Sequence, residues 1–544
     1  MTNLHGTRVF EGFAIGVIRV LQAKHPDVER RHVADTASEE KRFAQAKEQV
    51  KEDLALLRKE TLARVDSEVA DIFEVQRMML DDPDFTGSVL EIIGTERVNA
   101  EYAVSETAQT LTGRFLSHKN VYMQARAQDI TDLGNRLLLH LTGKDSDNAF
   151  TDRTDTILVA DTLTPGDCIR MDATSIKGIV TRLGSVQSHT AILACAMEIP
   201  SMTGVDFDPL IDGHAAILDS RAGVLLIDPD EETRRLYEKK IADESVLRAS
   251  LLSLKGQENK TRDGKTVDLF ANIGGVNDVA SAIKNDAGGI GLFRSEFLYL
   301  ASDNYPSEDE QFEAYKTVAE KMDGKRVIIR TLDIGADKHV DYMRLLPEEN
   351  PALGLRAIRI CLERPDLLRT QLRAVLRASA FGNIAVMYPM ITSVWEVRKL
   401  RGLFEDARAE LEEEHVPMAK HVEQGIMIET PAAVFISDEL AREADFFSIG
   451  TNDLTQYLLA SDRQNPHLER YYDPHHDAVL RAIKLTVQNA HKCGKRVAIC
   501  GELASDTDMI PYFLGLGIDE LSMTPSRILP VRDAVRKTNL GGSV

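Results

Sequence analysis

Residues 446–457 read FFSIGTNDLTQY, and this stretch decides how the C-terminal half of the chain folds. Four apolar-biased residues run into Gly450, which is typical of a buried strand with a tight exit. Asn452 and Asp453 stand at that exit, where an amide and a carboxylate can hold a hard cation and a substrate oxygen together. The same two residues could instead merely cap the helix that follows. The stretch alone leaves both interpretations open.

The pattern of an apolar strand followed by polar residues recurs through the C-terminal half. Helical patterns separate most of the apolar segments, as expected for a barrel of eight parallel strands, each followed by a helix. In that fold the chemistry lies on the loops after the C-terminal strand ends, so the polar residues there would converge on one rim. The eight predicted strands are 267–273, 290–293, 327–334, 384–390, 425–430, 446–450, 496–500 and 520–523.

Length, charge and cysteine usage narrow the class of protein. The chain has 544 residues, which suggests about three domains. Its 65 Lys and Arg against 86 Asp and Glu give a net charge of −21, which argues against general binding of nucleic acid or anionic membranes. An anionic substrate would therefore need a local basic cluster. The cysteines show no metal or disulfide spacing, and the N-terminus shows no signal pattern, so we expect a soluble, cytoplasmic protein.

Residues 22–146 are predicted to form a helical bundle. Phe43, Ala46, Val50, Leu54 and Leu57 recur at spacings of three and four, and the stripe resumes at 62–69. Residues 71–85, DIFEVQRMMLDDPDF, combine acidic side chains with two methionines. They could form an ordinary solvated face, which composition favours, or a docking surface for a basic partner.

The remaining N-terminal segments predict a small α/β domain and a linker. Short β-like runs occur between 156 and 227, and the stranded residues 7–21 would complete their sheet, which makes the helical region an insertion. The charged residues that follow have a helical pattern, and we expect them to form a hinge helix. The predicted domains are 1–21 plus 147–230 for the α/β domain, 22–146 for the helical subdomain, 231–256 for the linker helix and 257–544 for the barrel.

His189 is the candidate nucleophile of the α/β domain. Ser188 can cap the following helix, which places His189 in its first turn. The partial positive charge at the helix N-terminus disfavours the protonated imidazolium ring and would stabilise a dianionic phosphoryl group. Both properties suit a phosphorylatable histidine. An ordinary core or surface histidine is an equally good interpretation at this point.

Charged and polar side chains collect near the ends of the predicted barrel strands. Arginines beside two carboxylates suit a phosphorylated carboxylic acid, with Mg²⁺ held by the carboxylates and the guanidiniums on phosphate and carboxylate oxygens. A thiol at the rim can protonate a carbanion, although a buried cysteine can equally be inert. The candidates are Arg294, Arg330, Arg356, Arg463, Lys338, Glu429, Asp453, Asn452 and Cys500.

Seven barrel segments together resemble the signatures of one family, enzyme I of the bacterial-type sugar phosphotransferase system. They are GIGLFRSEFLYL, RTLDIGADK, ENPALGLRAIR, GIMIETPAA, FFSIGTNDLTQY, CGELASD and GIDELSMTP. EGFAIG, DIFEVQRMML and SHTAILA are similar to the N-terminal half of the same family. The resemblance therefore covers nearly the whole chain.

The resemblance implies a phosphoenolpyruvate–protein phosphotransferase. His189 would take a phosphoryl group from phosphoenolpyruvate with Mg²⁺ and pass it to a histidine of the phosphocarrier protein HPr, which the helical insertion would dock. The family dimerises through its barrel. By motif match, phosphoenolpyruvate would be held by Arg294, Arg330, Arg356, Arg463, Asn452 and Asp453, Mg²⁺ by Glu429 and Asp453, and the enolate would be protonated by Cys500.

The chain departs from the family pattern around the histidine. Ser185 and Gln187 replace a usual Gly and Thr, Cys195 stands where a basic residue is common, and Cys168 replaces an expected Thr. These changes concern the surroundings of a phosphohistidine and leave the nucleophile in place.

Two rival interpretations fit some of the same residues. A pyruvate phosphate dikinase or phosphoenolpyruvate synthase would need a nucleotide-grasping domain, and residues 1–150 are too short and too acidic for one. A regulatory paralogue without turnover is favoured only by the altered surroundings of His189. The sugar served by such an enzyme is not encoded here.

Overall fold

The computed structural model describes most of the chain as two compact units, Met1–Val246 and Leu247–Val544. For His189 only the backbone is described. None of the described helices is long and apolar enough to cross a membrane. The described residues are 2–21, 28–64, 67–116, 121–143, 155–163, 165–170, 175–184, 189–300, 302, 304–335, 340–346, 348–463 and 465–541.

An eight-stranded mixed sheet organises the first unit, in the order β1-β8-β7-β3-β4-β5-β6-β2. Strand β3 pairs in parallel with β4, where Val17 lies opposite Thr156, and antiparallel with β7. The stretch before the helical region thus lies in the middle of a sheet whose next strand comes after that region. The strands are β1 (Thr2–His5), β2 (Thr7–Phe10), β3 (Phe13–Leu21), β4 (Thr156–Ala160), β5 (Ile176–Thr181), β6 (Ser201–Thr203), β7 (Ala215–Asp219) and β8 (Val224–Ile227).

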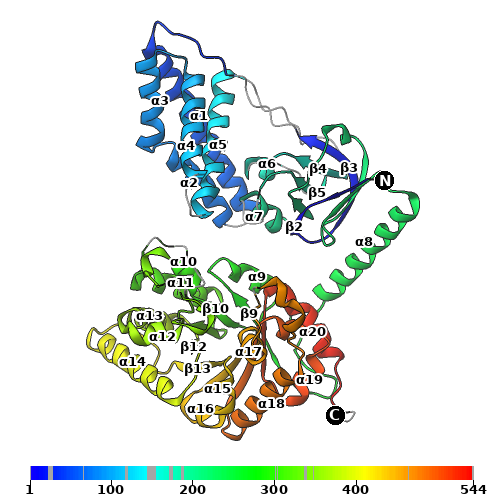
Figure 1. The fold of residues 1–544 in the computed structure, drawn as a ribbon, viewed down its shortest axis with the longest axis vertical. Helices are drawn as coiled ribbons and strands as arrows, with labels where there is room; N and C mark the ends of the chain where they lie inside the picture. The colour runs from blue at the N-terminus through cyan, green and yellow to red at the C-terminus, as the bar shows by residue number, and fades with distance from the viewer. Residues whose placement is uncertain are drawn as a thin grey trace. The chain divides into compact units, whose positions relative to one another are not determined.

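Five helices lie between β3 and β4 in the chain and run side by side as a bundle (Figure 1). The predicted stripe is its core, because Phe43, Val50 and Leu54 are at most 1% exposed. Asp82 caps α3 by accepting a hydrogen bond from the Asp84 N–H at 2.8 Å. The helices are α1 (Thr36–Arg64), α2 (Ser67–Met79), α3 (Pro83–Glu96), α4 (Ala100–Leu116) and α5 (Val121–Thr142).

The first unit is completed by short helices and by α8 (Glu231–Leu252). Tyr237 is the one buried residue of α8, and its hydroxyl donates to Asp219 Oδ2 at 2.8 Å. Its ring meets Phe13 edge-on, with the centroids 5.6 Å apart. Tyr237 is therefore the buried anchor of the helix, and at the surface Glu244 of α8 pairs with Arg221 while Lys240 lies over the Phe13 ring. The short helices are α6 (Pro165–Arg170), α7 (His189–Ala196) and the 3₁₀ turn η1 (Pro209–Ile211).

The second unit is a closed barrel of eight parallel strands with helices around it (Figure 1). Each predicted strand is present, and β16 closes the ring by pairing with β9. The predicted fold class, an α/β multidomain chain with a C-terminal (β/α)8 barrel, is confirmed. The strands are β9 (Asp268–Ile273), β10 (Ile290–Arg294), β11 (Val327–Arg330), β12 (Ile384–Tyr388), β13 (Glu423–Ile428), β14 (Phe446–Gly450), β15 (Arg496–Cys500) and β16 (Glu520–Met523).

The helices that cover the barrel bury one apolar face each; in α13, for example, Leu368, Leu372 and Val375 are at most 1% exposed. The α-helices are α9 (Asp278–Lys284), α10 (Glu296–Leu300), α11 (Glu308–Lys321), α12 (Ile358–Glu363), α13 (Pro365–Ala378), α14 (Val394–Glu413), α15 (Pro431–Phe435), α16 (Ser437–Glu443), α17 (Thr451–Leu459), α18 (Asp477–Lys492), α19 (Ile510–Leu516) and α20 (Ile528–Lys537). The 3₁₀ turns are η2 (Asp341–Met343), η3 (Pro351–Leu353), η4 (Ser379–Phe381), η5 (Pro466–Tyr471), η6 (Glu502–Ser505) and η7 (Pro525–Arg527).

One predicted strand, 327–334, is shorter in the structure and ends at Arg330. The backbone N–H of Leu332 donates to the side chain of Gln371 at 2.9 Å instead of continuing the ladder. Asp333 is thereby released from the sheet and can turn toward the rim residues described below.

Candidate active site at the barrel rim

Parallel strand pairing brings the predicted rim residues to one end of the barrel. Arg294 and Arg330 end β10 and β11 and lie opposite each other. Gly450 and Cys500 end β14 and β15 and are likewise paired. Glu429 directly follows β13. All are at C-terminal strand ends, which in a barrel of this type form a single rim.

Arg330 and Arg356 are buried and are held by carboxylates. Arg330 Nη2 donates to Glu296 Oε1 at 2.6 Å, and its Nη1 lies 3.1 Å from Asp333 Oδ2. Arg356 Nη2 donates to Asp333 Oδ1 at 2.8 Å. Asp333 therefore joins the two guanidiniums. In both arginines Nε is buried without a hydrogen-bond partner, so each retains a donor for another group.

The pKa of both arginines stays raised despite their burial. Desolvation would lower the pKa of Arg330, but the carboxylates of Glu296 and Asp333 outweigh it. For Arg356 the opposing charges are Asp333 and Asp453. Both side chains are therefore fixed positive charges inside a chain that is acidic overall.

Glu429 is almost fully buried, at 1% exposed, and accepts a hydrogen bond from the Met390 N–H at 2.6 Å. It packs against Gly450, where an added Cβ would lie 2.6 Å from Glu429 Oε2. Burial, together with the carboxylates of Asp453 and Asp333, raises the pKa of Glu429 to about 8. A cation beside it would reverse that effect and hold it as a carboxylate.

Asp453 is buried and only loosely paired. Its Oδ1 has no hydrogen-bond partner, and it lies 4.0 Å from Arg356 Nη1 and 3.9 Å from Arg463 Nη2. Helix α17 begins at Thr451, and its N-cap position is Gly450, which has no side chain. The capping interpretation of Asn452 and Asp453 is therefore wrong.

The two carboxylates fit Mg²⁺ in one particular mode. Among the described residues no group of three or more His, Cys, Asp or Glu side chains could hold a metal ion. Mg²⁺ commonly takes one or two protein carboxylates and completes its octahedron with water and substrate oxygens. Asp453 Oδ1, buried and without a donor, and Glu429 beside it suit that arrangement.

Asn452 lies against the loop that follows β15. Its Oδ1 accepts a hydrogen bond from the Glu502 N–H at 3.4 Å, and its backbone carbonyl accepts one from the Tyr472 hydroxyl at 3.1 Å. The approach requires Gly501, which has φ +117° and whose Cβ, if present, would lie 3.0 Å from Asn452 Oδ1.

Cys500 is buried, with its Sγ 3.5 Å from the carbonyl oxygen of Ile449. Burial raises the pKa of the Cys500 thiol to about 11. The group is therefore a neutral thiol near pH 7, which can give up a proton and is a poor nucleophile.

Arg294 and Arg463 are more accessible than the other two arginines. Arg463 has a side chain 37% exposed. Arg294 makes no ion pair with any residue that the structure describes. These two are the cations with the most freedom to contact a small molecule.

Two rim partners were not singled out from the sequence, Glu296 and Tyr457. Tyr457 OH lies 3.3 Å from Arg356 Nη1, and Glu296 holds Arg330. Glu296 occurs two residues after Arg294 in the same motif, and that proximity was the only available signal.

His189 lies in the other unit, as the first residue of α7. Ser185, Gln187 and Ser188, on which the capping argument depended, and Lys338 are outside the described residues. Cys168 is buried, and burial raises the pKa of its thiol. Cys195 is half-buried, with its Sγ 3.7 Å from the carbonyl oxygen of Val9. Neither thiol provides a charge for a histidine.

Three family models match successive parts of the chain. They describe the PEP-binding domain of PEP-utilising enzymes at residues 248–540, the N-terminal region of such enzymes at 5–126 and their mobile domain at 153–223. The first alone covers more than half of the chain, and it coincides with the barrel.

Curated relatives match over almost their whole length. The phosphoenolpyruvate-protein phosphotransferase of Priestia megaterium is 40% identical over 98% of this chain and 94% of its own. That of Bacillus subtilis (strain 168) is 41% identical over 99% and 95%. That of Geobacillus stearothermophilus is 42% identical over 98% and 93%. Because these relatives are 40–42% identical across almost the whole of both chains, and the PEP-binding family model covers the barrel, the chain belongs to the family of phosphoenolpyruvate-protein phosphotransferases.

Proposed function

We propose that the protein takes the phosphoryl group of phosphoenolpyruvate onto His189, releases pyruvate and passes the group to a histidine of the phosphocarrier protein HPr. The observation that carries this proposal is the convergence of four arginines, two carboxylates and a neutral thiol on one barrel rim, in a chain of this family. Phosphoryl transfer needs positioning and charge neutralisation more than covalent assistance, and this rim offers both.

The arginines bind and orient the substrate. Arg294, Arg330, Arg356 and Arg463, with Asn452, hold the phosphate and carboxylate of phosphoenolpyruvate. The fixed pairs of Arg330 and Arg356 with Asp333 give these forks a set orientation before substrate arrives. They also offset the repulsion that a chain of net charge −21 exerts on an anion.

Glu429 and Asp453 hold Mg²⁺, which when bound neutralises charge on the transferring phosphoryl group. An imidazole nitrogen of His189 attacks phosphorus, and the bond from phosphorus to the enol oxygen breaks. The electron pair passes through the enolate to its terminal carbon, which takes a proton from Cys500 Sγ and yields pyruvate. Water then returns the proton to the thiolate.

The other parts of the chain have separate tasks in this proposal. The α/β domain, 1–21 plus 147–230, carries His189, the linker 231–256 lets it move, and 257–544 holds the substrate. The helical subdomain 22–146 docks HPr. Met78, 65% exposed in a charged region, supports a docking surface there. Part of the acidic stretch 71–85 is paired within the helical bundle, because Asp81 pairs with Lys47 and Lys51.

We also propose a homodimer formed through the barrel, in the cytoplasm. Large apolar side chains are exposed in the segments that follow β10 and β11, namely Phe297 of α10 at 46%, Leu346 at 80% and Leu353 of η3 at 64%. Exposed apolar side chains in the segments after two paired strands favour an interface. Cysteines are free throughout the described chain, which suits a reducing compartment. Sedimentation of Leu346→Asp against wild type tests the dimer, and an unchanged association constant contradicts this surface.

The central test is transfer of label from phosphate-labelled phosphoenolpyruvate in the presence of Mg²⁺. The wild-type protein should acquire a label that maps to His189 and passes to HPr. His189→Ala should acquire none. His214→Ala is the matched control, because His214 belongs to the same domain and, among the described residues, its side chain pairs only with Asp228 on the surface, at 2.7 Å. A persistent label in His189→Ala overturns the proposal.

A further inference from the structure

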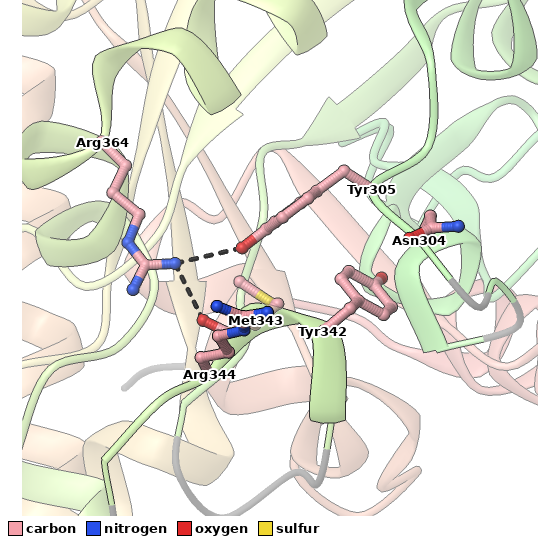
Figure 2. Close-up of a pocket in the computed structure, with 6 residues that line it drawn as sticks. All are labelled: Asn304, Tyr305, Tyr342, Met343, Arg344 and Arg364. Carbon is pink, nitrogen blue, oxygen red and sulfur yellow. Dashed lines mark hydrogen bonds between the residues drawn. The ribbon is translucent and has the colours of Figure 1, made fainter.

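A second cavity lies on the barrel unit and shares no lining residue with the rim site. It has a volume of about 440 Å³ and is lined by Asn304, Tyr305, Tyr342, Met343, Arg344 and Arg364. Figure 2 shows these side chains coming from three segments of the chain, with Arg364 bonded to two of the others. The volume is within the range of sites for small organic ligands.

Two arginines line this cavity without a carboxylate partner. Within the described part of the chain neither Arg344 nor Arg364 makes an ion pair. Arg364 Nη1 donates to the Tyr305 hydroxyl at 3.1 Å and to the Met343 carbonyl at 2.9 Å. Both acceptors are neutral, so the positive charge of Arg364 is not compensated. In a chain with 86 acidic and 65 basic residues, two unpaired guanidiniums beside one cavity favour a bound anion.

The walls of the cavity are aromatic and firmly held. The rings of Tyr305 and Tyr342 meet edge-on with their centroids 4.9 Å apart. The Tyr342 hydroxyl donates to the Tyr299 carbonyl at 2.6 Å. Arg344 is held at φ 49°, a left-handed conformation that a non-glycine residue adopts only with strain. Ring faces and Met343 suit a compact organic body beside the anionic group.

From these observations we propose that the cavity binds a small phosphate monoester, with Arg344 and Arg364 on the phosphate and the tyrosines against its organic part. Phosphate is the preferred anion because a guanidinium fork matches its oxygens and two such forks can share one dianion.

The cavity is joined to the rim site by a short series of hydrogen bonds. Tyr342 holds Tyr299 of α10, and Glu296 at the start of the same helix holds Arg330 at 2.6 Å. A ligand that shifts Tyr342 would therefore act on the position of Glu296 and, through it, on Arg330. The site is thereby suited to an effector. The coupling between the cavity and the rim site rests on the proposed function, in which Arg330 binds phosphoenolpyruvate.

Binding is tested with phenyl phosphate by titration calorimetry on the full chain carrying Arg294→Ala, which weakens the rim site. One binding event should remain. Arg344→Gly and Arg364→Lys should each weaken it roughly tenfold or more, because each removes charge-assisted hydrogen bonds. Arg344→Gly should keep the fold, since glycine suits φ 49°. Arg262→Ala is the matched control, an exposed arginine of the same unit far along the chain from the lining residues.

Three outcomes overturn the binding site. They are absence of any heat with the Arg294→Ala protein at millimolar phenyl phosphate, affinity that does not respond to Arg344→Gly or Arg364→Lys, and equal affinity for phenol. A further result also overturns it: if Arg344→Gly shifts the protein from dimer to monomer while phenyl phosphate binds unchanged, the arginines serve a second copy of the chain.

The coupling has its own test, which can fail while the binding site stands. In the wild-type protein, saturating phenyl phosphate should change the KM for phosphoenolpyruvate at least twofold. Tyr342→Phe should retain phenyl phosphate binding and lose that change. A KM that is the same with and without saturating probe overturns the coupling to Arg330. Absence of turnover in the wild-type protein without the probe would instead indicate that the proposed function is wrong.

Discussion

Asp333 shows how single residues at the rim make buried charges tolerable. Burying a guanidinium is costly unless carboxylates and hydrogen bonds replace water. Asp333 supplies one oxygen to Arg356 at 2.8 Å and the other to Arg330 at 3.1 Å. The two arginines consequently stay charged and oriented, while each keeps an Nε donor unused.

Cys500 is expected to act as a proton donor. Replacing it by alanine should lower kcat for pyruvate formation roughly 100-fold or more while KM for phosphoenolpyruvate changes little, because the lost group acts only on the developing carbanion. The raised pKa, about 11, keeps the thiol protonated at the pH of the assay. Steady-state kinetics measure both constants.

Cys493→Ala provides the control for this substitution, because Cys493 lies at the end of α18 and belongs to no strand end of the rim. Equal kcat in Cys500→Ala and wild type would assign Cys500 to packing alone.

Glu520 is expected to make the barrel less stable as pH rises. It is buried at the start of β16, its Oε1 has no hydrogen-bond partner, and burial raises its pKa to about 7. Below about pH 4.5 both folded and unfolded states hold the proton. Above that pH the unfolded chain releases it first, so stability falls until about pH 7 and is then level.

The substitution Glu520→Gln removes the loss of stability that follows ionisation of Glu520. Relative to wild type, its free energy of unfolding should rise by roughly 1–2 kcal/mol between pH 5.5 and pH 8, as denaturant titrations of the barrel transition measure. A difference between the two proteins that is constant over this interval would show that Glu520 does not titrate there.

At the scale of elements, α8 combines a long exposed helix with one anchor. Leu236, Val246 and Leu247 are more than half exposed, whereas Tyr237 is buried against β7 and Phe13. A helix with so thin an apolar face takes little stability from packing. Its buried attachment to the first unit is Tyr237, whose hydroxyl donates to Asp219, and the exposed pair of Arg221 with Glu244 adds a weaker surface contact.

Tyr237→Phe should loosen the first half of α8. The ring is kept but the buried Asp219 Oδ2 loses its donor, so amide hydrogens of residues 233–244 should exchange about tenfold faster. Leu236→Ala, at an exposed neighbouring position, should leave exchange unchanged. Equal protection in Tyr237→Phe and wild type would place the anchor elsewhere.

At the scale of the molecule, the two units have separate hydrophobic cores. The barrel core runs from Val267 to Val535, whereas the cores of the first unit draw only on residues up to Tyr237. Two units with separate cores commonly unfold separately. A ligand that binds one of them should stabilise that one alone.

Phosphoenolpyruvate with Mg²⁺ should therefore raise only one of two calorimetric transitions. In a His189→Ala protein, which prevents transfer, ligand at 100 times its Kd should add about 2.7 kcal/mol to the barrel and raise its Tm by roughly 4–5 °C. Glu429→Gln should reduce the shift. Equal shifts of both transitions would contradict separate unfolding, and no shift would contradict the barrel as the binding unit.

The sequence by itself determined the fold class, the eight barrel strands and the positions of most rim residues. Each of those conclusions depends on local information. The pattern that indicates a strand end, an apolar run followed by glycine and then a polar residue, lies in consecutive residues. Tyr237 shows the limit, since the linker helix was predicted but its anchor lies on a strand 18 positions away.

Only the tertiary structure decided which charges meet. The end of β11 at Arg330, the pairing of Glu296 and Asp333 with the buried arginines, the contact of Glu429 with Gly450, and the two unpaired arginines of the second cavity all join segments distant in the chain. The physical reason is that burial, desolvation and Coulomb energy depend on distances in space, which the packed barrel sets and local sequence does not.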